Sequence, residues 1–200
     1  MSDTGAILQV DVEAELEKII RQLNTIPEKI AAPNILKNAI NATSRKVRKQ
    51  LIKGAKDEYA IKDTKGLKDE SLGAPKILEA STSNMTAAIR SRGPMQDIMA
   101  FMTRPNVGTS AAAAQVLNAG TMKPLEVDGL KAFVARFASG HTAIVQRRGP
   151  ERLPIKKLLS PAVPHLLGNE RVREAAEAMA YETMQEEIQK RIDKVLGNMA

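Results

Sequence analysis

The sequence predicts an α+β fold in which helices pack on a small antiparallel sheet. Two segments, residues 34–56 and 169–196, repeat apolar residues every three or four positions, which is the period of a helix with one buried face. Between them, residues 131–147 are rich in β-branched and alternating residues around a Ser-Gly pair, a pattern typical of a β-hairpin. The length of 200 residues suits one domain, and we expect a single domain over residues 1–200.

The composition narrows the class of protein. With three Phe, two Tyr and no Trp, the core must be built from aliphatic residues, methionine and alanine. The absence of cysteine excludes disulfides and thiol chemistry. No apolar run approaches the roughly 20 residues of a membrane span, and residues 1–10 lack the features of a signal peptide. We therefore expect synthesis in the cytoplasm, no membrane contact and a flexible N-terminus over residues 1–10.

Two helices are predicted in the first third of the chain. Residues 11–24 form a short amphipathic pattern that Asp11 can cap. Residues 34–56 form a longer one, with basic residues on the face away from the apolar stripe. The positions expected to be buried in this second helix are Ile35, Leu36, Ala39, Ile40, Thr43, Val47 and Leu51.

The net charge of +7 is unevenly distributed, with eight Lys or Arg and no acid between Lys29 and Lys56. The densest group, which we call the basic helix cluster, consists of Arg45, Lys46, Arg48, Lys49 and Lys53. Two interpretations stay open: a solvated helix face, or a contact with phosphate or an acidic protein surface. Because no aromatic residues are interleaved, a nucleic-acid contact would be electrostatic and would not read sequence.

The middle of the chain carries weaker signals. Residues 62–75 are polar and contain two Gly and a Pro, which indicates a loop. Residues 76–82 and 85–92 are candidate strands joined around Ser83 and Asn84. Residues 93–110 look irregular, and the alanine tract at 111–114 is compatible with helix or strand.

The hairpin over residues 131–147 is expected to close through a two-residue turn at Ser139 and Gly140. Residues 150–164 contain four prolines and predict an extended arm with at most short helical turns and few internal hydrogen bonds. We expect this arm to dock on an adjacent subunit or on another neighbouring protein. Its apolar anchors would be Ile155, Leu158, Leu159 and Val163.

The helix over residues 169–196 can be capped by Asn169. Its predicted apolar stripe is Ala176, Ala180, Met184, Ile188, Ile192 and Val195. Glu187 and Arg191 have the i,i+4 spacing of a favourable pair, and the carboxylates of this helix are expected to form a solvated face.

No catalytic constellation stands out. The two histidines, His141 and His165, are far apart, and cysteine ligands are missing, so no metal site is expected. Ser139 and His141 are better explained by a turn than by a catalytic triad, because no orienting acid is evident. Glycine-rich phosphate loops are also absent. We expect no metal, no cofactor and no enzymatic activity.

A set of ordered segments resembles the minor tail protein Z family of phages with long, non-contractile tails. The segments are AFVARFASGH at 132–141, QRRG at 146–149, LPI at 153–155 and SPAVP at 160–164, followed by the last helix. Segments earlier in the chain also resemble the family pattern: NAIN at 38–41 with residues 45–48, YAI at 59–61, and SNMTA at 83–87. The resemblance covers roughly residues 15–196, and the Met-rich stretch at 94–102 departs from the family pattern.

The resemblance implies a tail completion protein that acts at the head-proximal end of the tail. It implies localisation in the virion, contacts with other tail or neck proteins, and a homo-oligomeric ring, of six copies by analogy with the family. It is also compatible with a non-specific contact with phage DNA. The alternative from another class is a sequence-independent DNA-binding protein, which the basic helix cluster would support.

Overall fold

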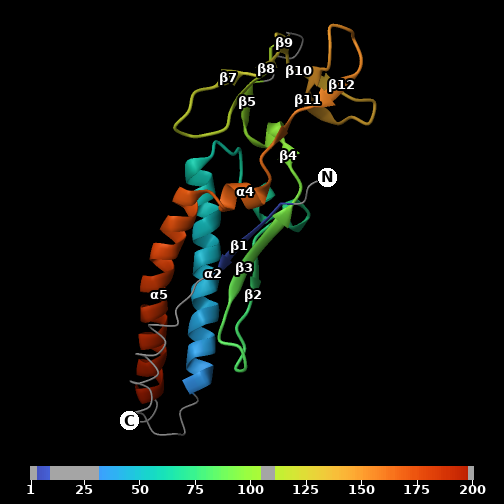
Figure 1. Cartoon of the computed structure of the whole chain (residues 1–200). Helices are drawn as coiled ribbons and strands as arrows, with labels where there is room; N and C mark the ends of the chain where they lie inside the picture. The colour runs from blue at the N-terminus through green and yellow to red at the C-terminus, as the bar shows by residue number, and fades with distance from the viewer. Residues whose placement is uncertain (1–3, 10–31, 105–110, 198–200) are drawn as a thin grey trace. The chain divides into compact units, whose positions relative to one another are not determined.

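The computed structural model describes residues 4–9, 32–104 and 111–197, and these form an α+β structure as expected (Figure 1). The helix expected over residues 11–24 lies outside the described residues. The sequence indicated one domain, and the contacts divide the chain into two compact units. We call Gly5–Gly54, Pro75–Ser91 and Leu167–Ala200 the helical unit, and Met1–Thr4, Ala55–Ala74 and Arg92–Leu166 the strand-rich unit.

Two long helices dominate the helical unit. Helix α2 (Ala32–Glu58) confirms the segment predicted at 34–56, and its last residues from Ala55 belong to the strand-rich unit. Helix α5 (Glu170–Gly197) confirms the segment predicted at 169–196, and it runs alongside α2 (Figure 1). Asn169 caps α5 by accepting a hydrogen bond at Oδ1 from the backbone N–H of Arg171, at 3.1 Å. All seven positions of the predicted α2 stripe are buried.

Most residues of a three-stranded sheet, with strand order β1-β3-β2, belong to the helical unit. Strands β2 (Lys76–Leu78) and β3 (Ala88–Gly93) are antiparallel, with Ile77 opposite Ile89, so the two weak strand predictions are confirmed with shorter bounds. Strand β1 (Thr4–Gln9) joins the sheet next to β3. Residues 4–9, which lie in the segment expected to be flexible, thus form a strand of this sheet.

The core of the helical unit joins both helices to the connection between β2 and β3. Partly buried Met85 and Ile192 pack against this core. Its buried members are Leu36, Ala39, Ile40, Ala80, Ala87, Met184 and Ile188. The α5 stripe is thus confirmed at its centre, where Ala176, Ala180, Met184 and Ile188 are all buried. Small alanines on α5 suit a close approach, and Gly54 of α2 leaves only 3.2 Å between a Cβ at its position and Val172 Cγ1.

The strand-rich unit is assembled from many short elements. These are α3 (Lys65–Lys68), the 3₁₀ turns η1 (Glu70–Leu72) and η2 (Ile98–Ala100), β4 (Gln96–Asp97), β5 (Met102–Arg104), β6 (Ala113–Gln115), β7 (Lys123–Pro124), β8 (Glu126–Val127) and β9 (Leu130–Lys131). The loop expected at 62–75 therefore contains a short helix and a 3₁₀ turn. The alanine tract leads into strand β6, which pairs with β5 and β7, so cross-strand pairing overrides its helix propensity.

The predicted hairpin is formed by β10 (Phe133–Arg136) and β11 (Thr142–Arg147), with Phe133 opposite Val145 and Arg136 opposite Thr142. Its turn differs from the two-residue turn that was expected. The Gly140 N–H donates to the carbonyl of Phe137, and Phe137 N–H donates to the carbonyl of His141. The loop therefore spans Phe137–His141, and Gly140 follows the turn in the left-handed conformation, at φ +79°.

A third strand, β12 (Ile155–Lys157), pairs antiparallel with β11. Strand β13 (Leu159–Ser160) then pairs with β4, and helix α4 (Val163–Leu167) follows. The expectation that residues 150–164 form an arm with few internal hydrogen bonds is wrong, because backbone pairing with β11 and β4 holds much of the segment within the chain.

The core of the strand-rich unit lies beneath this sheet. Its buried members are Ile98, Ala112, Ala114, Ala132 and Ile144. Val134 and Leu158 pack against them from β10 and from the residue after β12. Buried Gln146 of β11 donates from Nε2 to the carbonyl of Leu130, at 2.6 Å, which ties the hairpin to β9.

Candidate functional site

The basic helix cluster lies on α2, and the structure divides it into two groups. Arg45, Lys46, Lys49 and Lys53 are exposed, whereas Arg48 is partly buried, with a buried Nε that lacks a hydrogen-bond partner among the described residues. The predicted helical phase is therefore correct, because the cations point away from the core of the helical unit.

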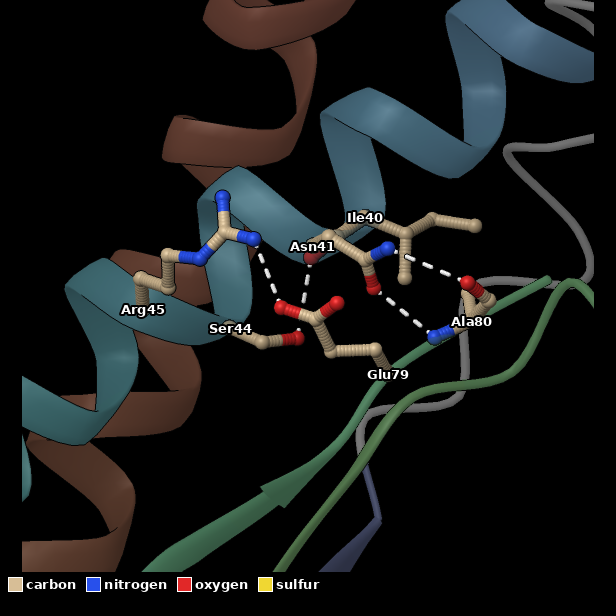
Figure 2. A network of polar contacts seen from close by, with 6 residues as sticks. All are labelled: Ile40, Asn41, Ser44, Arg45, Glu79 and Ala80. Atoms are coloured by element: carbon tan, nitrogen blue, oxygen red, sulfur yellow. Dashed lines mark hydrogen bonds and ion pairs between the residues drawn. The ribbon is translucent and has the colours of Figure 1, made fainter.

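Arg45 is held in an ion pair within the helical unit. Its Nη2 lies 2.6 Å from Oε1 of Glu79, at the end of β2 (Figure 2). One turn earlier on α2, the side chain of Asn41 exchanges two hydrogen bonds with the backbone of Ala80. Figure 2 shows both residues of α2 reaching the same short piece of chain. Arg45 is thus part of the attachment between α2 and the strand connection.

Lys46 is also engaged within the helical unit. Its Nζ lies 2.9 Å from Oε1 of Glu187 on α5, and Arg191 pairs with the same carboxylate. Hydrogen bonds from Arg191 and Lys46 lower the pKa of Glu187 to about 2. The expectation that the α5 carboxylates form a solvated face is wrong for Glu187, which is 7% exposed and sits between two cations.

Lys49 and Lys53 are the cations of the cluster that remain exposed and without an ion pair to any described residue. The structure therefore leaves a smaller basic surface on α2 than the sequence indicated. Arg45 and Lys46 help to attach α2 to the rest of the helical unit, and Lys49 and Lys53 stay available to an anionic partner.

The four proposed interface anchors differ in how far their side chains are exposed. Val163 is fully buried in its own chain, and Leu158 packs against the core of the strand-rich unit. Ile155 is partly buried in β12. Leu159 is the anchor that is available for contact, because its side chain is 47% exposed although its backbone pairs with β4. Burial in the core removes Val163 from any surface contact.

His141 lies beside a lysine and an aspartate, not in an isolated turn. Its Nε2 is 3.4 Å from Nζ of Lys157 and 3.7 Å from Oδ2 of Asp97, and Lys157 forms a closer ion pair with Asp97, at 2.9 Å. The His141 ring also stacks on Phe137. These contacts link the hairpin loop to β12 and β4, so they account for the histidine structurally.

A second basic surface was missed at the sequence level. Seven Lys or Arg and one acid, Glu151, occur between residues 131 and 157, and all seven cations are exposed. They are Lys131, Arg136, Arg147, Arg148, Arg152, Lys156 and Lys157. A charge count along the chain indicates this surface, whereas the β pattern of the hairpin does not.

One small pocket of about 130 Å³ lies in the strand-rich unit. Phe101, Leu67 and Leu166 provide its apolar lining, and Gln96 and Asp63 contribute polar groups. Among the described residues, no cluster of three or more His, Asp or Glu side chains could hold a metal ion. None of the described helices combines the length and apolar character needed to cross a membrane.

In comparisons with known proteins, no family model, curated protein or solved structure matches the chain.

Proposed function

We propose that this protein is a structural subunit of a phage virion, one that completes the tail at its head-proximal end. The observation that carries the proposal is the ordered set of segments that resembles the minor tail protein Z family. These segments fall on consecutive elements, namely the loop between β10 and β11, the end of β11, strand β12 and the entry to α4. Together with the earlier segments at 38–41, 59–61 and 83–87, they occur in the same order as in the family over most of the chain, and this shared order supports the proposal.

In this proposal the protein acts as a homo-oligomer, a ring, between tail or neck proteins. Leu159 supports an intersubunit contact because it is a large apolar side chain exposed on a strand whose backbone is fixed. A fixed backbone reduces the entropy that is lost when a partner binds. Single exposed leucines are common on monomers, so the proposal needs a functional test of this residue.

The alternative function, sequence-independent DNA binding through α2, has less support than the sequence suggested. Two of its five cations are paired with Glu79 and Glu187 inside the helical unit. Cations that are already paired release fewer counterions when they meet a phosphate, and they therefore contribute less to binding.

The test is deletion of the gene from the phage or prophage that carries it, followed by complementation. We expect deletion to abolish infectious particles while capsids and tail tubes still form, as seen by electron microscopy. The wild-type gene should restore the titre, and Leu159→Ser should not. A normal titre after deletion would refute the proposed function.

The matched control for Leu159→Ser is Leu78→Ser, which changes a leucine of similar exposure, 44%, on β2 of the helical unit. We expect this variant to complement fully. Both purified variants should keep the wild-type circular dichroism spectrum, so that a loss of titre reports on assembly and not on folding.

A further inference from the structure

The most concentrated unpaired positive charge in the described chain lies where β11 passes into β12. Residues 147–157 contain five Lys or Arg and one acid, Glu151. Lys157 is paired with Asp97, whereas Arg147, Arg148, Arg152 and Lys156 form no ion pair with any described residue. We call these four residues the basic hairpin.

The basic hairpin is built on an ordered frame. Arg147 lies opposite Ile155 and Gln146 lies opposite Lys156 in the pairing of β11 with β12. The backbone N–H of Arg148 donates to the carbonyl of Pro154, at 3.0 Å, and closes the connection. The cations therefore project from the β11–β12 side of the three-stranded sheet β10-β11-β12, where the backbone is held in place by strand pairing.

The charges of the basic hairpin have no internal role of the kind found on α2. Arg45 and Lys46 neutralise carboxylates of their own chain, whereas four exposed cations within ten residues repel one another. An anionic partner would relieve this repulsion. Three of the four are arginines, whose planar guanidinium groups bind phosphate oxygens in a bidentate manner.

The aromatic rings near these cations each have an intramolecular partner. The guanidinium of Arg147 lies 5.8 Å from the centre of the Phe133 ring, and Phe137 stacks with His141. A ring face that is engaged in this way cannot also stack an unpaired base, and such stacking is one contribution to single-strand binding. The arrangement therefore favours a backbone contact with double-stranded nucleic acid that does not depend on base sequence.

We propose that the basic hairpin is a binding site for the phosphate backbone of double-stranded DNA. Arg148, Arg152 and Lys156 contact phosphates, and Arg147 is held against Phe133 beside them. This inference rests on charge and geometry alone and does not depend on the proposed virion role. The DNA-binding test of the purified protein can therefore fail or succeed independently of the complementation test.

The test is fluorescence anisotropy of a short labelled DNA duplex with the purified full chain, titrated over a range of salt concentrations. The variant combines Arg148→Gln, Arg152→Gln and Lys156→Gln. Each lost phosphate contact should lower the slope of log affinity against log salt by about 0.9, or about 2.7 for all three. The control combines Lys49→Gln, Lys53→Gln and Lys56→Gln on α2, and it removes the same number of positive charges. It should keep most of the wild-type slope of log affinity against log salt.

Three further measurements distinguish double-stranded DNA from other anionic partners. A labelled single strand, poly-glutamate and anionic phospholipid vesicles replace the duplex in the same assay. Tighter binding to the duplex than to each of these, lost in the hairpin variant, supports the proposal. Preferential binding to poly-glutamate, to vesicles or to the single strand overturns it, as does an equal loss of duplex binding in the α2 control. Circular dichroism of both variants must match the wild type.

Discussion

Asn41 and Ala80 exchange two hydrogen bonds although they are far apart in the chain. The Ala80 N–H donates to Asn41 Oδ1, at 2.8 Å, and Asn41 Nδ2 donates to the Ala80 carbonyl, at 3.1 Å. Both groups are buried, so water cannot replace either partner. This pair fixes α2 against the connection between β2 and β3, next to the Arg45 and Glu79 ion pair.

Replacement of Asn41 by Leu should therefore destabilise the protein by about 1–3 kcal/mol, because the N–H and carbonyl of Ala80 would stay buried and unpaired. Urea unfolding followed by circular dichroism measures the difference. The control is Asn38→Leu, on the exposed side of the same helix, which should change the midpoint little. Equal effects of the two substitutions would show that the Asn41 side chain has no special role.

The carboxylate of Glu187 should make stability dependent on acidic pH. Its pKa falls from 4.5 to about 2 on folding, because Arg191 and Lys46 donate hydrogen bonds to the charged form. A lowered pKa stabilises the folded state at any pH above the unfolded value, and the contribution is lost as the pH falls from about 4.5 toward 2. The shift corresponds to at most about 3 kcal/mol, and to less because Lys46 is half exposed.

Unfolding free energies measured between pH 7 and pH 2 should show this loss in the wild type and not in Glu187→Gln. The neighbouring substitution Glu186→Gln, at an exposed position, should keep the wild-type dependence. Parallel pH profiles for wild type and Glu187→Gln would contradict the assigned role of this carboxylate.

Burial decreases along α5 from Ile188 to Ile192, so alanine substitutions at these two positions should lower the free energy of unfolding by different amounts. Ile188 is 4% exposed in the core of the helical unit, whereas Ile192 packs at its edge and is only partly buried. Ile188→Ala should cost about 2–5 kcal/mol, and Ile192→Ala should cost less, because its site can fill with water or neighbouring side chains. Urea midpoints in the reverse order would show that Ile192, and not Ile188, faces the core of the helical unit.

Gly140 is required by its backbone conformation rather than by space. Its φ is +79°, and no atom lies within 4 Å of a Cβ built on it. Gly140→Ala should cost about 1–2 kcal/mol, because L-residues with a Cβ disfavour the left-handed region. Gly140→Asn should cost less, since asparagine tolerates that region. Gly149→Ala, also in open space but without positive φ, is the control and should be close to neutral in thermal unfolding.

Local patterns predicted the long elements well. The apolar periods of residues 34–56 and 169–196 identified α2 and α5 with their buried faces, because a helix repeats its pattern over many turns. The hairpin was also predicted, and only its turn is longer than the expected two residues, because Phe137 pairs with His141 and leaves three residues between them. Strands of two or three residues, such as β4 and β13, show no periodicity to recognise.

The candidate sites were predicted less well, for a different reason. Whether Lys46 is free depends on Glu187, and no local pattern connects residues so far apart. Likewise, four prolines suggested an unpaired arm, but proline lacks only its own amide donor. The residues between the prolines were still able to form β12 and β13.

The most direct test of the proposed virion role is to locate the protein in purified particles. The gene in its phage is given a short epitope tag, and density-purified particles are labelled with gold-conjugated antibody and imaged by electron microscopy. The proposal predicts that gold lies at the junction of head and tail on most particles. It also predicts that mass spectrometry finds the protein in a constant ratio to the major tail protein. Particles that lack both the label and the protein, from a phage that still infects normally, would contradict it.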